Sequence, residues 1–240
     1  HILHSPNARA SADIVHGLRE QGLPTREALA TEQAARNSET LADAQRLINS
    51  RNLRQPNTLR RFLDKIQREQ RQGQSGSLQQ LRDAVARAES GSEVYLENMP
   101  NPQNPQEPYG ADVLDVTRRE ASQHKVVTGN SPPQGNDPVY NNMRDAIQQL
   151  QGAGGENPPP GFRRIADVRL TNRANRFFNM SREQILNELV RYPWGELLKG
   201  FDEIRFTNGR GTHSITPRDI LGTPVVPPPR RPPEQKEPHQ

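Results

Sequence analysis

The spacing of the apolar residues, which changes near residue 73, constrains the fold of this chain most. Before that point apolar residues recur every three or four positions, as they do on one face of an α-helix. One such stripe contains Leu59, Phe62, Leu63 and Ile66. The stripes are narrow, and helices of that kind usually pack on one another or on a partner. We therefore predict a small, polar, all-α region at residues 1–72 and a flexible hinge at 73–77, with the sequence "GQSGS".

From residue 78 to residue 221, helical stripes alternate with short runs in which every second residue is apolar. This alternation predicts an α/β domain. The order that we expect is helix, three strands, helix, strand, helix, strand. The predicted helices lie at 77–91, 138–152 and 181–192, and the predicted strands at 92–98, 111–117, 122–128, 163–172 and 201–209.

Residues 222–240 are rich in proline and cannot bury a core of their own. We interpret them as a disordered tail or linker, with a proline-rich docking peptide as the alternative. Only 31% of the chain is hydrophobic and 5% aromatic, which is too polar for one compact domain over the whole length. No run of about 18 apolar residues predicts a membrane span. No signal peptide is recognisable, and the opening "HILHSPNARA" resembles the edge of an excised fragment.

Several kinds of chemistry are excluded by what the sequence lacks. The chain has no cysteine, which excludes disulfides and thiolate metal sites. Its six histidines are scattered without the spacing of a zinc site. The glycine-rich segments do not stand between a strand and a helix as a phosphate-binding loop would, and no serine-hydrolase elbow is present.

The charge of the chain permits a nucleic-acid partner without requiring one. The formal net charge is +4, a mild bias that an ordinary basic protein would also show. Residues 51–72 carry seven basic and two acidic side chains. This segment fits either a helix face that contacts only water or a helix face that contacts phosphate groups.

Polar residues interrupt two predicted strands in the stretch "GADVLDVTRREASQHKVVTG", residues 110–129. Because alternate strand residues share a face, Gln123 and Lys125 point the same way and His124 points the other way. A hairpin closed near residues 118–121 would place Asp112 roughly opposite Lys125. One side of the hairpin would then collect a carboxylate, an amide and an ammonium group.

This combination suits the hydrolysis of a phosphodiester. A hard cation such as Mg²⁺ or Mn²⁺ takes oxygen ligands, which Asp112 and Gln123 can supply. Lys125 can orient the attacking water or stabilise the negative charge that develops on the phosphate. The alternative is a plain cross-strand ion pair between Asp112 and Lys125.

The pattern G-x-D, ten residues, then Q-x-K resembles the PD-(D/E)xK nuclease superfamily, in the Mrr-like variant in which glutamine replaces the second acid. The resemblance covers about residues 78–207, and Ala111 stands where the family often has proline. It implies a restriction-endonuclease-like αβββαβ core in which Asp112 and Gln123 bind Mg²⁺ and Lys125 acts in catalysis. It also implies a further acid from the first helix. That acid would be Glu89, or less favourably Asp83, with Glu97 on the first strand as another candidate.

The helix after the Q-x-K strand would lie beside such a site. Tyr140 and Arg144 share a stripe on it with Gln148, so we expect Arg144 and Tyr140 to bind substrate. The alternative is that this stripe faces water while Met143, Ile147 and Leu150 pack. We interpret Trp194 as a core anchor, and we place His213 at the surface in a glycine-rich turn.

Taken together, the sequence predicts a metal-dependent nuclease with nucleic acid as substrate, and DNA is favoured over RNA. A small cysteine-free nuclease behind polar linkers resembles a bacterial toxin or effector. Such a protein would be secreted or injected, would act in the cytoplasm of a target cell and would have a cognate immunity protein. The helical region would then serve in loading, delivery or neutralisation. Two alternatives remain: a non-catalytic nucleic-acid-binding module, or a cytoplasmic adaptor that binds proteins through its helices and proline-rich tail.

Overall fold

Five helices precede the first strand of the chain. The structure is a computed structural model and describes residues 5–132 and 135–227. The helices are α1 (Pro6–Glu20), α2 (Thr25–Asn37), α3 (Leu41–Ser50), α4 (Leu59–Arg71), which follows the short 3-10 helix η2 (Pro56–Thr58), and α5 (Gly76–Glu89). The predicted helical region is therefore present. The separate helix α2 was not predicted, because its buried positions are mainly small residues such as Ala28, Ala34 and Ala35.

A six-stranded mixed sheet follows the helices. Its strands lie side by side in chain order: β1 (Val94–Met99), β2 (Tyr109–Asp115), β3 (Glu120–Val127), β4 (Arg163–Leu170), β5 (Glu203–Asn208) and β6 (Gly211–Ile215). Strands β1, β2 and β3 are antiparallel neighbours, β3, β4 and β5 are parallel, and β6 is antiparallel to β5. The predicted α/β class is confirmed.

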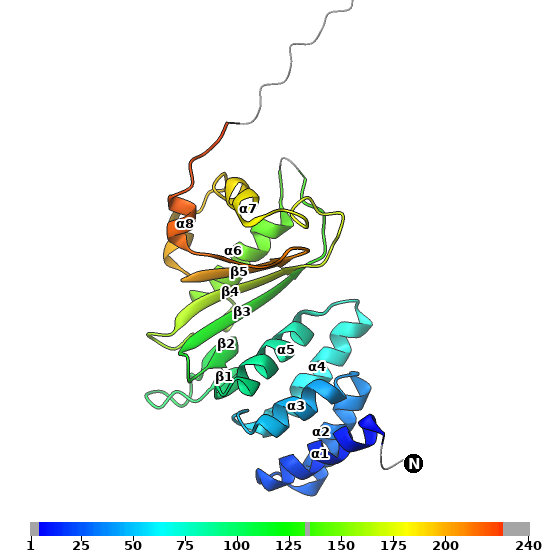
Figure 1. Cartoon of the computed structure of the whole chain (residues 1–240). Coiled ribbons are helices and arrows are strands. Elements are labelled where there is room, and N and C mark those ends of the chain that lie inside the picture. Colours follow the sequence, from blue (N-terminus) through cyan, green and yellow to red (C-terminus); the bar gives the residue numbers. More distant parts are fainter. Residues whose placement is uncertain (1–4, 133–134, 228–240) are drawn as a thin grey trace, which may run out of the picture.

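Helices connect the parallel strands, because a parallel pair needs a crossover. Helix α6 (Pro138–Leu150) and the 3-10 helix η3 (Ala153–Gly155) lead from β3 to β4. Helix α7 (Arg182–Leu189) and the 3-10 helix η4 (Gly195–Lys199) lead from β4 to β5, and α8 (Pro217–Leu221) follows β6. In Figure 1, α5 lies against one side of the sheet with α1–α4 beyond it, while α6 and α7 lie on the other side.

The predicted hinge at 73–77 forms the turn between α4 and α5 and the first residues of α5. One hydrophobic cluster extends from Ile14 of α1 through α3, α4 and α5 to Leu96 of β1 and Val113 of β2. Helices α1 and α3 cross closely, since a Cβ at Gly17 would lie 2.5 Å from Cγ2 of Ile48. The helices and the first two strands therefore share one core, and a second core fills the space between β3–β6 and α6–α7.

Three local expectations differ from the structure. The β2–β3 turn lies at residues 116–119, two residues before the predicted closure. His213 lies in strand β6 rather than in a turn, and its Nε2 is 2.9 Å from Oδ1 of Asn208. Helix α8 was not predicted at all.

Trp194 is buried in the second core, as expected, and its indole N–H donates to the carbonyl of Leu189. Most of the predicted proline-rich tail, residues 228–240, lies outside the described residues.

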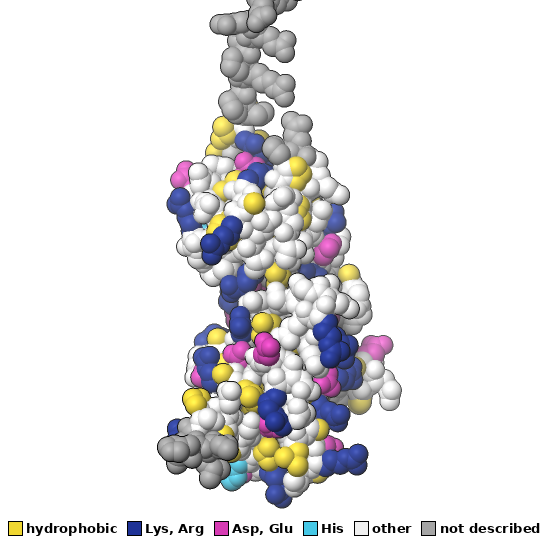
Figure 2. Space-filling model, turned by 90° about the vertical axis from the view of Figure 1, so that its right-hand side faces the viewer, with side chains coloured by type: hydrophobic (Ala, Val, Ile, Leu, Met, Phe, Trp, Pro, Cys, Tyr) yellow, Lys and Arg dark blue, Asp and Glu magenta, His cyan; other side chains and the backbone are white. Residues whose placement is uncertain are grey.

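The described surface is mixed in charge. In Figure 2, Lys and Arg side chains are spread over the helical half, interspersed with Asp, Glu and hydrophobic side chains. No helix among residues 5–132 and 135–227 combines the length and the apolar composition that a membrane span needs.

Candidate active site

Asp112 lies where the β2–β3 ladder stops. The paired residues run from Asp115↔Glu120 to Val113↔Ser122, so Asp112 is level with Gln123 and not with Lys125 as expected. Beyond the ladder, the backbone N–H of His124 donates to Oδ2 of Asp112 at 2.7 Å. The Gln123 amide bonds both the backbone N–H and Oδ1 of Asp112, each at 3.3 Å. Polar side chains thus satisfy backbone groups that a regular ladder would have paired, which explains their place in these strands.

Two further glutamines hold this cluster from the neighbouring helices. Gln80 of α5 donates to the backbone carbonyl of Asp112. Gln149 of α6 accepts a hydrogen bond from Nε2 of Gln123 at 2.9 Å. Sequence reasoning missed Gln149, because a helical stripe alone does not fix the phase of a helix against a strand.

A cavity of about 580 Å³ opens beside Asp112 at the ends of β1 and β2. Five charged side chains line this cavity, which we call the strand-end cavity: Lys65, Glu97, Glu107, Asp112 and Glu156. Lys65 comes from α4, and its Nζ lies 2.8 Å from Oε1 of Glu97. Glu156 follows η3, in a Gly- and Pro-rich loop that carried no periodic signal, so sequence reasoning missed it.

Glu97 occupies an irregular position in its strand. The pairing of β1 with β2 shifts between Leu96 and Asn98, and the backbone of Glu97 has φ = 67°. A bulge re-aims the side chain that it carries, and a left-handed non-glycine residue stores strain that clusters at functional sites. The bulge allows the Glu97 carboxylate to line the cavity.

The negatively charged carboxylates of the strand-end cavity repel one another. Burial, together with the neighbouring carboxylates of Asp112 and Glu97, raises the pKa of Glu156 to about 7. Burial also raises the pKa of Asp112, against the lowering effect of His124, Lys65 and Lys125. A bound cation would relieve this repulsion.

Lys125 is half-buried on β3 and lines a second cavity of about 430 Å³, between the α4–α5 turn and the end of β3. Gln74, Ser75 and Asn142 line the same cavity. The positive charge of Lys125 acts on both Asp112 and Glu156. The structure therefore brings Asp112 and Gln123 into contact, and it places Lys125 two residues after Gln123 on β3, in a separate cavity.

Glu89 and Asp83 do not join this group. Glu89 pairs with Arg46 of α3 at the exposed end of α5. It lies nine residues after Gln80, or about 13 Å along the helix axis. The Asp83 carboxylate contacts Arg87 at 3.1 Å and His124 at 3.1 Å, on the side of the sheet that α5 covers.

Tyr140 and Arg144 also do not line the strand-end cavity. The ring of Tyr140 is buried and stacks on Tyr192 with the centroids 4.4 Å apart. Its hydroxyl donates to the carbonyl of Pro193 at 2.8 Å. Arg144 is partly exposed and lies 3.6 Å from Asp145. The residues of α6 that reach the site are Gln149 and Asn142 instead.

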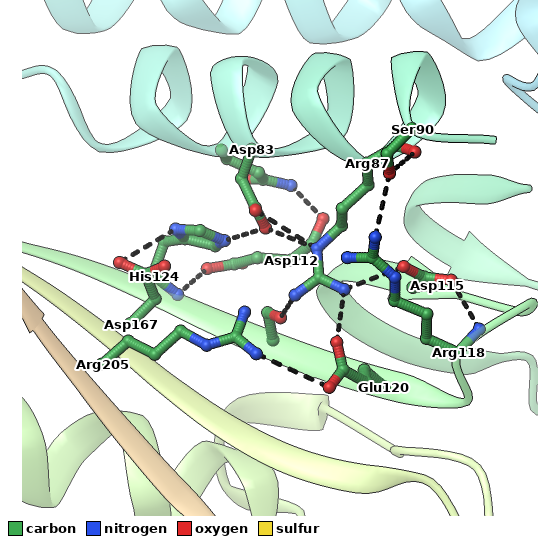
Figure 3. Close-up of polar contacts among 12 residues, drawn as sticks. Asp83, Arg87, Ser90, Asp112, Asp115, Arg118, Glu120, His124, Asp167 and Arg205 are labelled. Atoms are coloured by element: carbon green, nitrogen blue, oxygen red, sulfur yellow. Dashed lines mark hydrogen bonds and ion pairs between the residues drawn. The ribbon is translucent and has the colours of Figure 1, made fainter. Parts of the chain in front are cut away.

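A buried charge network lies on the opposite side of β3, under α5 (Figure 3). Its centre is Arg87, which is 3% exposed. The Arg87 guanidinium donates to Asp115 at 2.9 Å, to Glu120 at 2.8 Å and to Oγ of Ser122 at 3.0 Å. Together with Asp83, His124 and Asp167, these residues form what we call the Arg87–His124 network.

His124 links this network to the candidate site. Its ring lies 3.1 Å from Asp83 and 3.9 Å from Asp167. Although burial lowers it, the pKa of His124 is raised to about 9 by the carboxylates of Asp167, Asp83 and Asp112. The same residue thus contacts the network through its ring and the Asp112 carboxylate through its backbone N–H.

The side chains at the site could supply a small number of ligands to a metal ion. Among residues 5–132 and 135–227, no group of three or more His, Asp or Glu side chains is spaced to hold a metal ion. Mg²⁺ often takes only one or two protein carboxylates and completes its shell with waters and substrate phosphates. The Asp112 carboxylate lies beside a cavity with three more carboxylates and fits that smaller requirement. The Gln123 amide oxygen, which accepts from the backbone N–H of Asp112, has a second lone pair for a metal ion.

Comparison with known proteins adds no assignment. No protein-family model, curated protein or solved structure matches this chain. The chemistry of the site must therefore be argued from its own geometry.

Proposed function

We propose that this chain is a metal-dependent nuclease that hydrolyses phosphodiester bonds in nucleic acid, with DNA favoured over RNA. The observation that carries the proposal is the contact of Asp112 with Gln123 at the end of the β2–β3 ladder, beside a cavity with three further carboxylates, with Lys125 two residues after Gln123 on the same strand. The contacts of Asp112 with Gln123 and His124 make a plain Asp112–Lys125 ion pair a poorer account of these residues.

The order of the elements supports the same proposal. From α5 onward the chain runs helix, three antiparallel strands, helix and a parallel strand. This is the αβββαβ order of the PD-(D/E)xK superfamily, which the sequence resembles. Asp112 lies on the second strand and the Gln123/Lys125 pair on the third, the positions that the resemblance assigns to the metal-binding and catalytic residues.

Each residue then has a role that its position permits. Asp112 and Gln123 would hold Mg²⁺ or Mn²⁺, with Glu97 or Glu156 as a further carboxylate. The ion would polarise the phosphate and lower the pKa of a bound water. Lys125 would orient the attacking water or stabilise the charge that develops on the phosphate oxygens. In the overall reaction the water oxygen forms a bond to phosphorus and one P–O ester bond breaks.

We further propose that the nuclease acts as a bacterial toxin or effector in the cytoplasm of a target cell. This step rests on the resemblance and on the cysteine-free, polar composition of the chain. It implies a cognate immunity protein as partner. Expression of the wild-type chain in bacteria should then stop growth, and Asp112→Ala should restore it.

The experiment that tests the nuclease proposal uses plasmid DNA and total RNA as substrates. The purified chain is incubated with each in Mg²⁺, Mn²⁺ or EDTA, beside Asp112→Ala and Lys125→Ala. Asp145→Ala and Lys199→Ala are matched controls, because both side chains are exposed and lie outside the cavities described above. We expect metal-dependent cleavage by the wild type and both controls, and no cleavage by either site variant.

Two results would contradict the proposal. One is a folded wild-type protein that cuts neither substrate with Mg²⁺ or Mn²⁺. The other is cleavage that persists in Asp112→Ala. Salt-dependent binding without cleavage would favour a nucleic-acid-binding module, and absence of both would favour an adaptor.

A further inference from the structure

Helix α4 lies beside the ends of the strands that carry the candidate site. Thr58 at its start and Arg61 in its first turn line a cavity of about 250 Å³ against β1. One turn further, Lys65 lines the strand-end cavity. Another turn further, Glu69 lines the cavity that contains Lys125. These four positions are three or four residues apart, so one face of α4 borders all three cavities.

The cavity around Arg61 is a neighbour of the strand-end cavity, because the two share lining residues. Glu97 and Asn98 line both this cavity and the strand-end cavity. We call the first of them the α4 subsite. Its lining, apart from Glu97, consists of Asn57, Thr58, Arg61, Phe62, Leu96 and Asn98.

The composition of the α4 subsite suits one nucleotide. The two apolar residues, Phe62 and Leu96, belong to the first core and form the apolar floor of the subsite, where the edge of a sugar or a base can rest. Asn57 and Asn98 supply amide groups that can donate and accept hydrogen bonds. Arg61 is exposed and has no ion-pair partner among residues 5–132 and 135–227, so its guanidinium is available to a phosphate.

Three other basic residues of the same segment are already paired, whereas Arg60, Arg68 and Arg71 do not line the subsite. Arg51 contacts Glu20, Arg54 contacts Glu93, and Lys65 contacts Glu97. Arg61 differs from them because it lines the α4 subsite and has no ion-pair partner among the described residues.

We propose that the α4 subsite binds a nucleotide of the substrate strand next to the bond that is cleaved, with its phosphate on Arg61. This inference rests on the proposed nuclease function. It makes the helical region a wall of the active site rather than a separate delivery module. Lys65, which joins α4 to Glu97 inside the strand-end cavity, holds that wall against the sheet.

The test measures binding separately from cleavage. A fluorescein-labelled single-stranded oligothymidine is titrated with the full chain in EDTA, and anisotropy is followed at several salt concentrations. Arg61→Gln is compared with the wild type. Arg60→Gln is the matched control, because Arg60 is an exposed neighbour on α4 that does not line the subsite.

We expect Arg61→Gln to reduce the slope of log K against log salt by about 0.7, the value for one lost phosphate contact on a single strand. With this change in slope, the ratio of the wild-type affinity to the Arg61→Gln affinity is about fivefold larger at 0.1 M salt than at 1 M. Arg60→Gln should keep the wild-type slope. In cleavage assays, Arg61→Gln should raise KM and leave kcat unchanged, because a flanking contact binds ground state and transition state alike.

Equal slopes for Arg61→Gln and Arg60→Gln would overturn the subsite, and so would a folded wild-type chain that does not bind the oligonucleotide. Because binding is measured in EDTA, the nuclease proposal can fail on its own. A chain that cuts no substrate but loses one phosphate contact in Arg61→Gln keeps the subsite as a binding site.

Discussion

Two clusters of charged residues lie on opposite sides of strand β3, and they differ in how their charges are balanced. In the Arg87–His124 network, each buried carboxylate contacts a cationic side chain: Arg87 binds Asp83, Asp115 and Glu120, and His124 lies against Asp83 and Asp167. In the strand-end cavity, Lys65 pairs with Glu97. Within the described residues, Asp112 and Glu156 have no ion-pair partner there. A balanced cluster holds the fold together, whereas an unbalanced one beside a cavity is suited to bind a cation.

The largest expected effect is a loss of cleavage activity when the Asp112 carboxylate of the strand-end cavity is replaced. Asp112→Asn keeps an acceptor for the His124 N–H but removes the charge, so we expect cleavage to fall by about 10³-fold. That loss corresponds to about 4 kcal/mol of barrier. Initial rates on an oligonucleotide with a fluorophore and a quencher measure it. Urea unfolding should give nearly the wild-type stability, and a large loss of stability would place Asp112 in the structural cluster instead.

Replacement of Arg87, the centre of the Arg87–His124 network, should lower the free energy of unfolding. Arg87→Met leaves Asp115 buried without its cation, while Glu120 keeps Arg163 and Arg205. Loss of one partner of a buried ion pair typically costs about 3–5 kcal/mol. Urea unfolding measures the free energy. The control is Arg82→Met on the same helix, whose side chain is 55% exposed and lies 3.8 Å from Asp43. It should cost less than about 1 kcal/mol. Equal effects of the two substitutions would contradict the role of Arg87.

The contribution of the Arg87–His124 network to the stability of the protein should depend on pH, because His124 titrates. Its pKa is about 9 in the folded protein against 6.5 unfolded, so the stability that its charge provides is fully present below pH 6.5. That stability is lost as the pH rises through about 9, and its size is on the order of 3 kcal/mol. Urea unfolding at pH 6.5 and at pH 9.5 checks this. His124→Gln should show a smaller decrease over the same range, and an unchanged pH profile would disprove the assignment.

The smallest expected effect concerns Tyr140, a residue outside both clusters. Tyr140→Phe removes the hydrogen bond to the carbonyl of Pro193 and should cost about 1 kcal/mol. We expect the cleavage rate to be unchanged, because the ring is stacked in the core between α6 and Tyr192. A rate that falls without a loss of stability would restore Tyr140 to the substrate-binding role that its helical stripe suggested.

The elements around the site could be predicted because each has a local signature. Alternation in 109–127 gave the two strands, and Asp112, Gln123 and Lys125 stood out as polar residues inside them. The register of β2 against β3 could not be predicted with the same accuracy. A turn displaced by two residues placed Asp112 level with Gln123, and no local pattern fixes the turn at 116–119, with the sequence "VTRR", to that precision.

Some residues at the site are far from Asp112 in the sequence, and no sequence pattern indicates that they reach it. Glu156 comes from a loop and Lys65 from a helix 47 positions before Asp112. A helical stripe predicts that α4 buries one face, but not that its polar edge borders the strand ends. The same limit explains why residues 73–77 suggested a boundary although one core continues across them.

Binding of Mn²⁺ to the purified chain, measured by titration calorimetry without nucleic acid, tests the central claim most directly. The claim is that the Asp112 carboxylate makes the strand-end cavity a metal site. It predicts saturable binding in the wild type and in Tyr140→Phe, and loss of that binding in Asp112→Asn. Binding of the same strength and stoichiometry in folded Asp112→Asn would contradict it.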